Sequence, residues 1–258
     1  MSETRVTLVT GASQGIGREI ALAFARHGDS LVLAARDREN LEATAESARE
    51  LGAEAIVVPT DITRPEDAEG AATAAVEGFG RIDVLINNSG VGGPSGPLWQ
   101  LSLEDWRSTF AVNVEGVFLV SRAVIPHMIE GRGGSIVNIG SITGKRPLWG
   151  RSPYAATKTA LIGLTRTLAI EAGPYGIRVN LISPGFVSGP RLDWVIEAQA
   201  NGRGLTTDQV RAELEDLAAL HRLTEPGDIA RVALFLASDD ARAITGADIN
   251  ANSGVVMH

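Results

Sequence analysis

The feature that most constrains this chain is the regular alternation of short β-rich runs with helical patterns, which extends almost from one end to the other. Such alternation is the sequence form of repeated βα units, in which parallel strands are buried between helices. We therefore expect an α/β fold, a doubly wound parallel sheet of the Rossmann type. The predicted strands are Val6–Thr10, Ser30–Ala35, Ala55–Val58, Val84–Asn87, Ser135–Ile139, Arg178–Ser183 and Asp248–Ala251.

The chain is expected to form a single domain that spans residues 1–258. Hydrophobic residues make up 44% of it, enough for one sizeable core, and no linker-like stretch divides it. Two segments interrupt the rhythm, the Gly90–Pro97 loop and a long insertion at about 185–225. Because ligands of open α/β sheets lie beyond the carboxyl ends of the strands, both are candidate walls of a site. We interpret the insertion as a substrate lid.

Charge and composition exclude several functions. With 23 basic and 31 acidic residues the net charge is −8, which repels phosphate backbones and anionic lipid, so neither nucleic acid nor a membrane is an expected partner. There is no cysteine, and the four histidines are scattered, so no metal site is expected. No uncharged apolar run approaches the roughly 18 residues of a spanning helix. A cytoplasmic location is expected.

A glycine-rich segment, Thr10–Gly17, lies between the first predicted strand and the helix expected at Ile16–His27. Glycines there permit a tight turn, and the helix N-terminus offers free N–H groups and positive potential to a pyrophosphate. The segment lacks the Lys-Ser/Thr ending of a nucleoside triphosphate loop, so a dinucleotide is favoured over ATP. The candidate contacts are Gly11, Ser13, Gln14, Gly15, Ile16 and Gly17.

The end of the second predicted strand should hold the residue that reads the adenosine ribose of the dinucleotide. An acid suits a free 2′-hydroxyl, and a cation suits a 2′-phosphate. Arg36 occupies this place, so NADP(H) is favoured over NAD(H). Asp37 follows it, and either opposes that phosphate or caps the helix that begins near Arg38.

Tyr154 and Lys158 stand one helical turn apart, so both project from the same helix face. An ammonium beside a phenol lowers the phenol's pKa from about 10, which makes Tyr154 a usable acid or base. Ser141 lies just beyond the strand that ends at Ile139, at the edge where a ligand is expected, and its hydroxyl can polarise a carbonyl. The three residues together indicate catalysis.

The order and spacing of these motifs resemble those of the short-chain dehydrogenase/reductase family, in its branch of about 250 residues that contains β-ketoacyl-carrier-protein reductases. The resemblance covers essentially the whole chain. Two departures stand out: Ser89 replaces the usual alanine, and Ser188 lies where the family often has a threonine. The resemblance rests on the glycine segment, Asn87–Gly90, Asn113, Ser141, Tyr154, Lys158 and Pro184–Gly185.

The resemblance implies a role for each matching residue. Tyr154 would be the general acid in carbonyl reduction and the general base in alcohol oxidation, and Ser141 would hold the substrate oxygen. Lys158 would bind the nicotinamide ribose and lower the tyrosine's pKa, while Asn113 would hold a water in a proton relay. The further cofactor contacts it implies are Asp61 and Ile62 near the adenine, Asn87 at the end of the fourth strand with Gly90 after it, and Pro184, Gly185 and Val187 at the nicotinamide end.

The predicted function is therefore that of an oxidoreductase that passes a hydride between NADP(H) and a small carbonyl or secondary alcohol. The alternatives are a non-catalytic NADP(H)-binding sensor and an NAD-dependent alcohol dehydrogenase of the same family. Trp149 and Trp194 suggest an apolar substrate, whereas one arginine such as Arg151 or Arg191 would select a carboxylate or phosphate. Apolar residues on more than one face of the long helices, and the resemblance, predict a homotetramer.

Overall fold

The computed structural model describes residues 4–146 and 148–258. Within these residues seven strands, all parallel, form one sheet in the order β3-β2-β1-β4-β5-β6-β7. The chain winds outward from β1 to β3, returns to the centre and winds outward again, so the strand order reverses between β1 and β4. The predicted doubly wound fold and all seven predicted strands are confirmed. The strands are β1 (Val6–Thr10), β2 (Ser30–Ala35), β3 (Ala55–Pro59), β4 (Val84–Asn87), β5 (Gly134–Ile139), β6 (Ile177–Pro184) and β7 (Asp248–Ala251).

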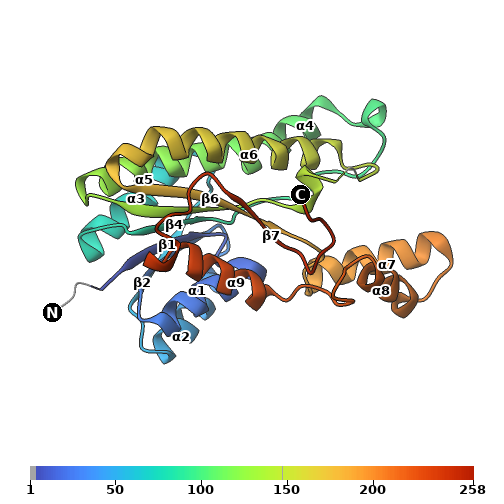
Figure 1. Ribbon diagram of the computed structural model, residues 1–258, viewed down its shortest axis with the longest axis horizontal. Coiled ribbons are helices and arrows are strands. Elements are labelled where there is room, and N and C mark those ends of the chain that lie inside the picture. The colour runs from blue at the N-terminus through green and yellow to red at the C-terminus, as the bar shows by residue number, and fades with distance from the viewer. Residues whose placement is uncertain (1–3, 147) are drawn as a thin grey trace.

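Helices cover both faces of the sheet (Figure 1). Successive strand residues point to opposite faces, so Leu8 lies in one buried cluster and Val9 in the other. Burial on both sides is why the central strands are mostly apolar. One face packs on α1 (Gly15–His27), α2 (Arg38–Glu50) and α9 (Pro226–Leu236), and the other on α3 (Pro65–Phe79), α5 (Gly116–Glu130) and α6 (Ser152–Ala172).

The helical stretch before β5 is made of two helices joined without a break. α4 (Leu103–Phe110) continues into α5 through a π-helical turn, Ala111–Glu115. The combined stretch, Leu103–Glu130, is long and apolar enough by length and composition to cross a membrane, since an 18-residue window within it has a mean hydropathy of 1.4, although no single apolar run reaches that length. In this fold α5 packs against α3 and lies over β4, which is the environment of a sheet-covering helix.

The insertion at about 185–225 forms two helices, α7 (Pro190–Arg203) and α8 (Thr207–Asp216), beyond the carboxyl end of β6 (Figure 1). The helices pack on each other around a small apolar cluster separate from the sheet's core. Gly204, with φ +66°, ends α7, because this left-handed conformation favours glycine. The two ends of the insertion are joined by a bridge between Val187 and Thr224.

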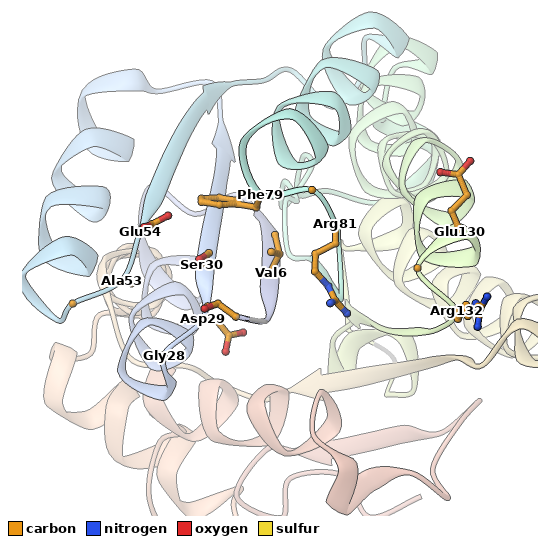
Figure 2. A pocket seen from close by; sticks show the side chains of 14 residues that line it. Val6, Gly28, Asp29, Ser30, Ala53, Glu54, Phe79, Arg81, Glu130 and Arg132 are labelled. Carbon is orange, nitrogen blue, oxygen red and sulfur yellow. The ribbon is translucent and has the colours of Figure 1, made fainter. Parts of the chain in front are cut away.

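A cavity of about 730 Å³ lies at the opposite edge of the sheet, where the strands begin (Figure 2). Its labelled lining includes Val6 and Ser30 at the starts of β1 and β2, with Arg81 just before β4. None of the residues predicted for catalysis lines it. The chemistry predicted from the sequence therefore belongs to the other edge of the sheet, where the strands end.

Candidate active site

The turn from β1 to α1 forms a cradle of main-chain groups. Gly11 and Gly15 adopt left-handed conformations, with φ of +65° and +56°. The residue before α1, Gln14, makes no side-chain cap, so side chains leave the N–H groups of the first turn uncapped. A Cβ at Gly17 would lie 2.2 Å from the Gly11 carbonyl oxygen, so only glycine allows this close packing. The turn fits an anionic group at a helix N-terminus.

Asn88 holds this cradle against the end of β4. Its Nδ2 donates to the carbonyl oxygens of Thr10 and Gly11, both at 3.1 Å. The Thr10 hydroxyl in turn accepts the N–H groups of Asn88 and Ser89, at 3.1 Å each. Asn88 is not among the site residues predicted from the sequence. The sequence signal that could have predicted this role is the alternation of side chains along a strand. Because adjacent residues point to opposite faces, Asn88 and Asn87 should have different partners.

The end of β2 presents Arg36 to solvent without a hydrogen bond or ion pair to any described residue. Asp37 caps α2: its carboxylate accepts the N–H of Asn40 at 3.1 Å. Of the two roles left open for Asp37, the structure therefore shows the cap. Bonds from the Thr63 N–H at 3.0 Å and hydroxyl at 2.8 Å lower the pKa of Asp61, and the charge of Arg36 contributes further. Arg36 thus lies close enough to Asp61 to influence it.

Ser141, Tyr154 and Lys158 meet where β5 ends. Ser141 follows the strand, and Tyr154 and Lys158 lie on α6, whose first turn contains Pro153. The Lys158 Nζ is buried, donates to the Ile139 carbonyl oxygen at 2.8 Å, and lies 5.7 Å from the centre of the Tyr154 ring. The structure thus brings together the three side chains that the sequence singles out for catalysis.

The phenol of Tyr154 is held in a strongly positive environment. Burial alone would raise its pKa. The charges of Lys158 and Arg191, a hydrogen bond with Ser141 and the charge of Arg151 outweigh burial and lower the pKa from its ordinary value of 10.0. A phenol of this kind can exchange a proton with a substrate oxygen nearer to neutral pH than free tyrosine can.

Asn113 lies in the π-helical turn and is completely buried. Its Oδ1 accepts the Val91 N–H at 2.8 Å, and its Nδ2 donates to the Val91 carbonyl at 2.9 Å and to the Thr157 hydroxyl at 3.1 Å. The side chain therefore fixes the loop after β4 to α6, next to Lys158. π-helical turns are frequent at functional sites. The side chain's donors are both used, so a water here would have to donate to it or bind the main chain.

The remaining predicted contacts surround this centre. Asn87 is buried beneath the sheet's edge, where its Nδ2 donates to Ser121 and Asn138. A Cβ at Gly90 would lie 3.3 Å from the Asn113 Oδ1 and 3.6 Å from the Lys158 Nζ, so this glycine lies beside both side chains. Pro184 ends β6, and Gly185 and Val187 lie at the start of the insertion. Ile62 is buried against Gly116.

Three other residues noted in the sequence lie outside this centre. The Ser188 hydroxyl donates to the Glu225 carboxylate at 2.9 Å, so this hydrogen bond links the two ends of the insertion. Trp149 and Trp194 are 77% and 67% exposed, and neither covers Tyr154 in this conformation. They remain predicted walls of the substrate pocket.

The chain is similar to known proteins over nearly its whole length. The family model described as Enoyl-(Acyl carrier protein) reductase matches residues 11–256. An uncharacterized oxidoreductase of Methylorubrum extorquens is 40% identical, with 98% of each chain covered. A 3-oxoacyl-[acyl-carrier-protein] reductase of Thermotoga maritima is 34% identical, with 99% of each covered.

Solved structures agree with the sequence matches. A tryptophan variant of actinorhodin polyketide ketoreductase with NADPH has a TM-score of 0.94 at 33% identity, over 99% of this chain and 98% of that one. NAD⁺-bound xylitol dehydrogenase has a TM-score of 0.91 at 33% identity, over 97% and 98%. The fold and site define a Rossmann-type oxidoreductase. Within that class, the chain belongs to the short-chain dehydrogenase/reductase family, in the branch similar to the ketoacyl reductases.

Proposed function

We propose that this enzyme interconverts a carbonyl and a secondary alcohol with NADP(H), and that Tyr154 is its general acid and base. The observation that carries the proposal is the positively charged environment of the Tyr154 phenol, made by Lys158, Arg191 and Arg151 with a hydrogen bond from Ser141. This arrangement stabilises the phenolate that remains after a proton passes to the substrate oxygen. A non-catalytic sensor has no need of such a group.

Each side chain has a distinct part in this mechanism. The Ser141 hydroxyl holds the substrate oxygen, and Tyr154 donates its proton to that oxygen in reduction and accepts it in oxidation. Lys158, fixed by the Ile139 carbonyl, favours the ionised phenol and binds the nicotinamide ribose. Asn113 positions the Val91 loop beside them, and we propose that a water in contact with this region restores the proton.

The cradle at Gly11–Gly17 fits the pyrophosphate of a dinucleotide, since the first turn of α1 lacks a side-chain cap and the lack of a Cβ at Gly17 lets that turn pack closely on Gly11. The bound dinucleotide supplies or takes up the hydride. We propose NADP(H) over NAD(H), because Arg36 is exposed and pairs with no residue that the structure describes, and Asp37 is occupied in capping α2. Solved relatives are described with either NADPH or NAD⁺, so the family alone does not select.

The experiment that tests the reaction is a panel of ketones with NADPH and NADH, followed by the cofactor's absorbance, with the matching alcohols and oxidised cofactors as the reverse assay. The expected result is carbonyl-dependent consumption of NADPH at a higher kcat/KM than of NADH. Failure to consume either cofactor with any carbonyl, and to reduce either with any alcohol, would contradict the proposed function.

We also propose that the enzyme works as a cytoplasmic homotetramer. α5 and the end of α6 expose apolar side chains on their outer faces, including Phe118 at 50% and Ile170 at 78%. A second copy of the chain would remove this surface from water. Light scattering at micromolar concentration should give about four times the 27.1 kDa chain mass, and the mass of one chain would contradict the assembly.

A further inference from the structure

Two arginines from distant segments converge on Tyr154. Arg151 directly precedes α6, and Arg191 lies in the first turn of α7. Their guanidinium carbons are 5.1 and 5.7 Å from the centre of the Tyr154 ring. A Cβ at Gly92 would lie 2.7 Å from an Arg191 nitrogen and 3.0 Å from an Arg151 nitrogen, so the two guanidinium groups are neighbours beside the loop after β4.

Neither of these guanidinium groups has a carboxylate partner among the described residues. Other arginines of the same insertion do: Arg203 pairs with Glu213 at 2.7 Å, and Arg211 pairs with Asp193 at 2.8 Å. The chain as a whole carries eight more acidic than basic side chains. Arg151 and Arg191 are therefore two neighbouring cations with no carboxylate of the described residues between them, and they lie at the candidate active site.

Lys158 makes this a group of three cations around one phenol. Burial lowers the pKa of both Lys158 and Arg151, and the charge of Arg191 lowers both further, so the positive charges repel one another. The ring attracts nearby cations by only about 0.5–1 kcal/mol at exposed sites, and a phenolate would bring a single negative charge. Three positive charges this close repel one another, and a bound anion would offset that repulsion.

We propose that the substrate is an acidic carbonyl compound or alcohol, whose anionic group lies between Arg151 and Arg191 beside Gly92 while its reacting oxygen lies at Ser141 and Tyr154. This rests on the proposed function and names its substrate class. Two guanidinium groups suit a carboxylate or a phosphate ester, since each presents several N–H donors in a fixed plane. The cofactor's own phosphates have other candidate partners, the α1 cradle and Arg36, on the β1–β2 side of the sheet.

The test compares matched pairs of substrates that differ in the anionic group. Oxo carboxylates with two to five carbons between the groups are assayed beside their methyl esters, and dihydroxyacetone phosphate beside dihydroxyacetone. The wild-type enzyme should favour the anionic member by about 10- to 100-fold in kcat/KM, the range of one or two charge-assisted hydrogen bonds. The carboxylate and phosphate arms show which anion is preferred.

Three variants locate the effect. Arg151→Gln and Arg191→Gln should each reduce the acid-to-ester ratio about tenfold and leave the KM for NADPH nearly unchanged. Gly92→Ala keeps both charges but places a methyl group where their nitrogens lie, so it should reduce the ratio as well. Arg203→Gln is the matched control, because it removes the same charge from the other end of α7. An unchanged ratio in all three variants, or equal wild-type use of both members, would overturn the inference while leaving the reaction intact.

A measurement without turnover separates this inference from the proposed function. The chain has two tyrosines, so subtracting the spectrum of Tyr154→Phe from that of the wild type follows ionisation of the Tyr154 phenol. Hexanoate bound between the arginines should raise the pKa of this phenol, because its charge offsets theirs, and the Arg151→Gln/Arg191→Gln double variant should not respond. A hexanoate-dependent rise in the phenol's pKa, in a protein that turns over no carbonyl or alcohol, would support the anion site and reject the proposed reaction. No response of the wild type would overturn the anion site.

Discussion

The candidate cofactor cradle and the candidate substrate pocket around Tyr154 lie at the same edge of the sheet, but they are built from different parts of the chain. The cradle is made by main-chain groups of one segment, and its glycines are required because a side chain at Gly17 would collide with Gly11. The candidate pocket is made by side chains from the segment after β5, from the start of α6 and from the insertion, with positive charges gathered around one phenol. We therefore expect the cradle to be sensitive to added side-chain volume. The pocket should be sensitive to the loss of a charged group or a hydroxyl.

The largest effect expected on the pocket side comes from Tyr154→Phe. This change removes the proton donor and keeps the ring, so kcat should fall by about 10²- to 10⁴-fold while the Kd for NADPH stays within about twofold. Steady-state kinetics and fluorescence titration of NADPH check the two values. Tyr175→Phe is the control, because Tyr175 is exposed and lies at the far end of α6. A variant with more than a tenth of the wild-type kcat would reject Tyr154 as the acid.

On the cradle side the corresponding change is Gly17→Ala. The added methyl group would press on the Gly11 carbonyl and on Asn88, so the free energy of unfolding should fall by about 1–3 kcal/mol and NADPH binding should weaken tenfold or more. Urea denaturation and NADPH titration measure the two effects. Gly70→Ala on α3, where a Cβ meets nothing, should be neutral or stabilising by up to about 1 kcal/mol. Equal behaviour of the two variants would show that the cradle is not sterically restricted.

A change of charge at the cradle's rim should act on cofactor choice rather than on binding in general. Arg36→Asp replaces an attraction for a 2′-phosphate by a repulsion, so kcat/KM for NADPH should fall at least tenfold while that for NADH is kept or improved. Arg26→Asp, the same substitution at the other end of α1, is the control. A native preference for NADH, or an equal loss for both cofactors, would mean that Arg36 does not read the ribose.

The smallest effect is expected in the insertion, which we propose to be a lid over the candidate substrate pocket. α7 and α8 pack mainly on each other and are joined to the sheet through the residues around the Val187–Thr224 bridge, so they can move as one body. Hydrogen exchange of these helices should slow when NADPH and substrate bind, whereas α2, which packs on the sheet's core, should change little. Identical exchange of α7 and α8 with and without both ligands would reject a lid.

The same contrast explains what the sequence could predict. Strand burial, the left-handed glycines of the cradle and the one-turn spacing of Tyr154 and Lys158 are local, so they leave a readable pattern. The π-helical turn at Asn113 leaves no such pattern, since it depends on how α4 and α5 pack. The sequence offered Arg151 or Arg191 as alternatives, and only the fold brings both together, because they come from segments 40 residues apart that meet at Gly92.

The pH dependence of the two reaction directions tests the central claim most directly. A protonated Tyr154 is needed for reduction and an ionised one for oxidation, so kcat/KM for a neutral ketone should fall, and that for its alcohol should rise, as the pH passes the phenol's pKa. Because the surrounding charges lower that pKa, both transitions should lie below pH 10.0. Arg191→Leu should move both upward, with Arg203→Leu unchanged. Transitions at or above pH 10.0, or the same profile in the residual activity of Tyr154→Phe, would contradict the account.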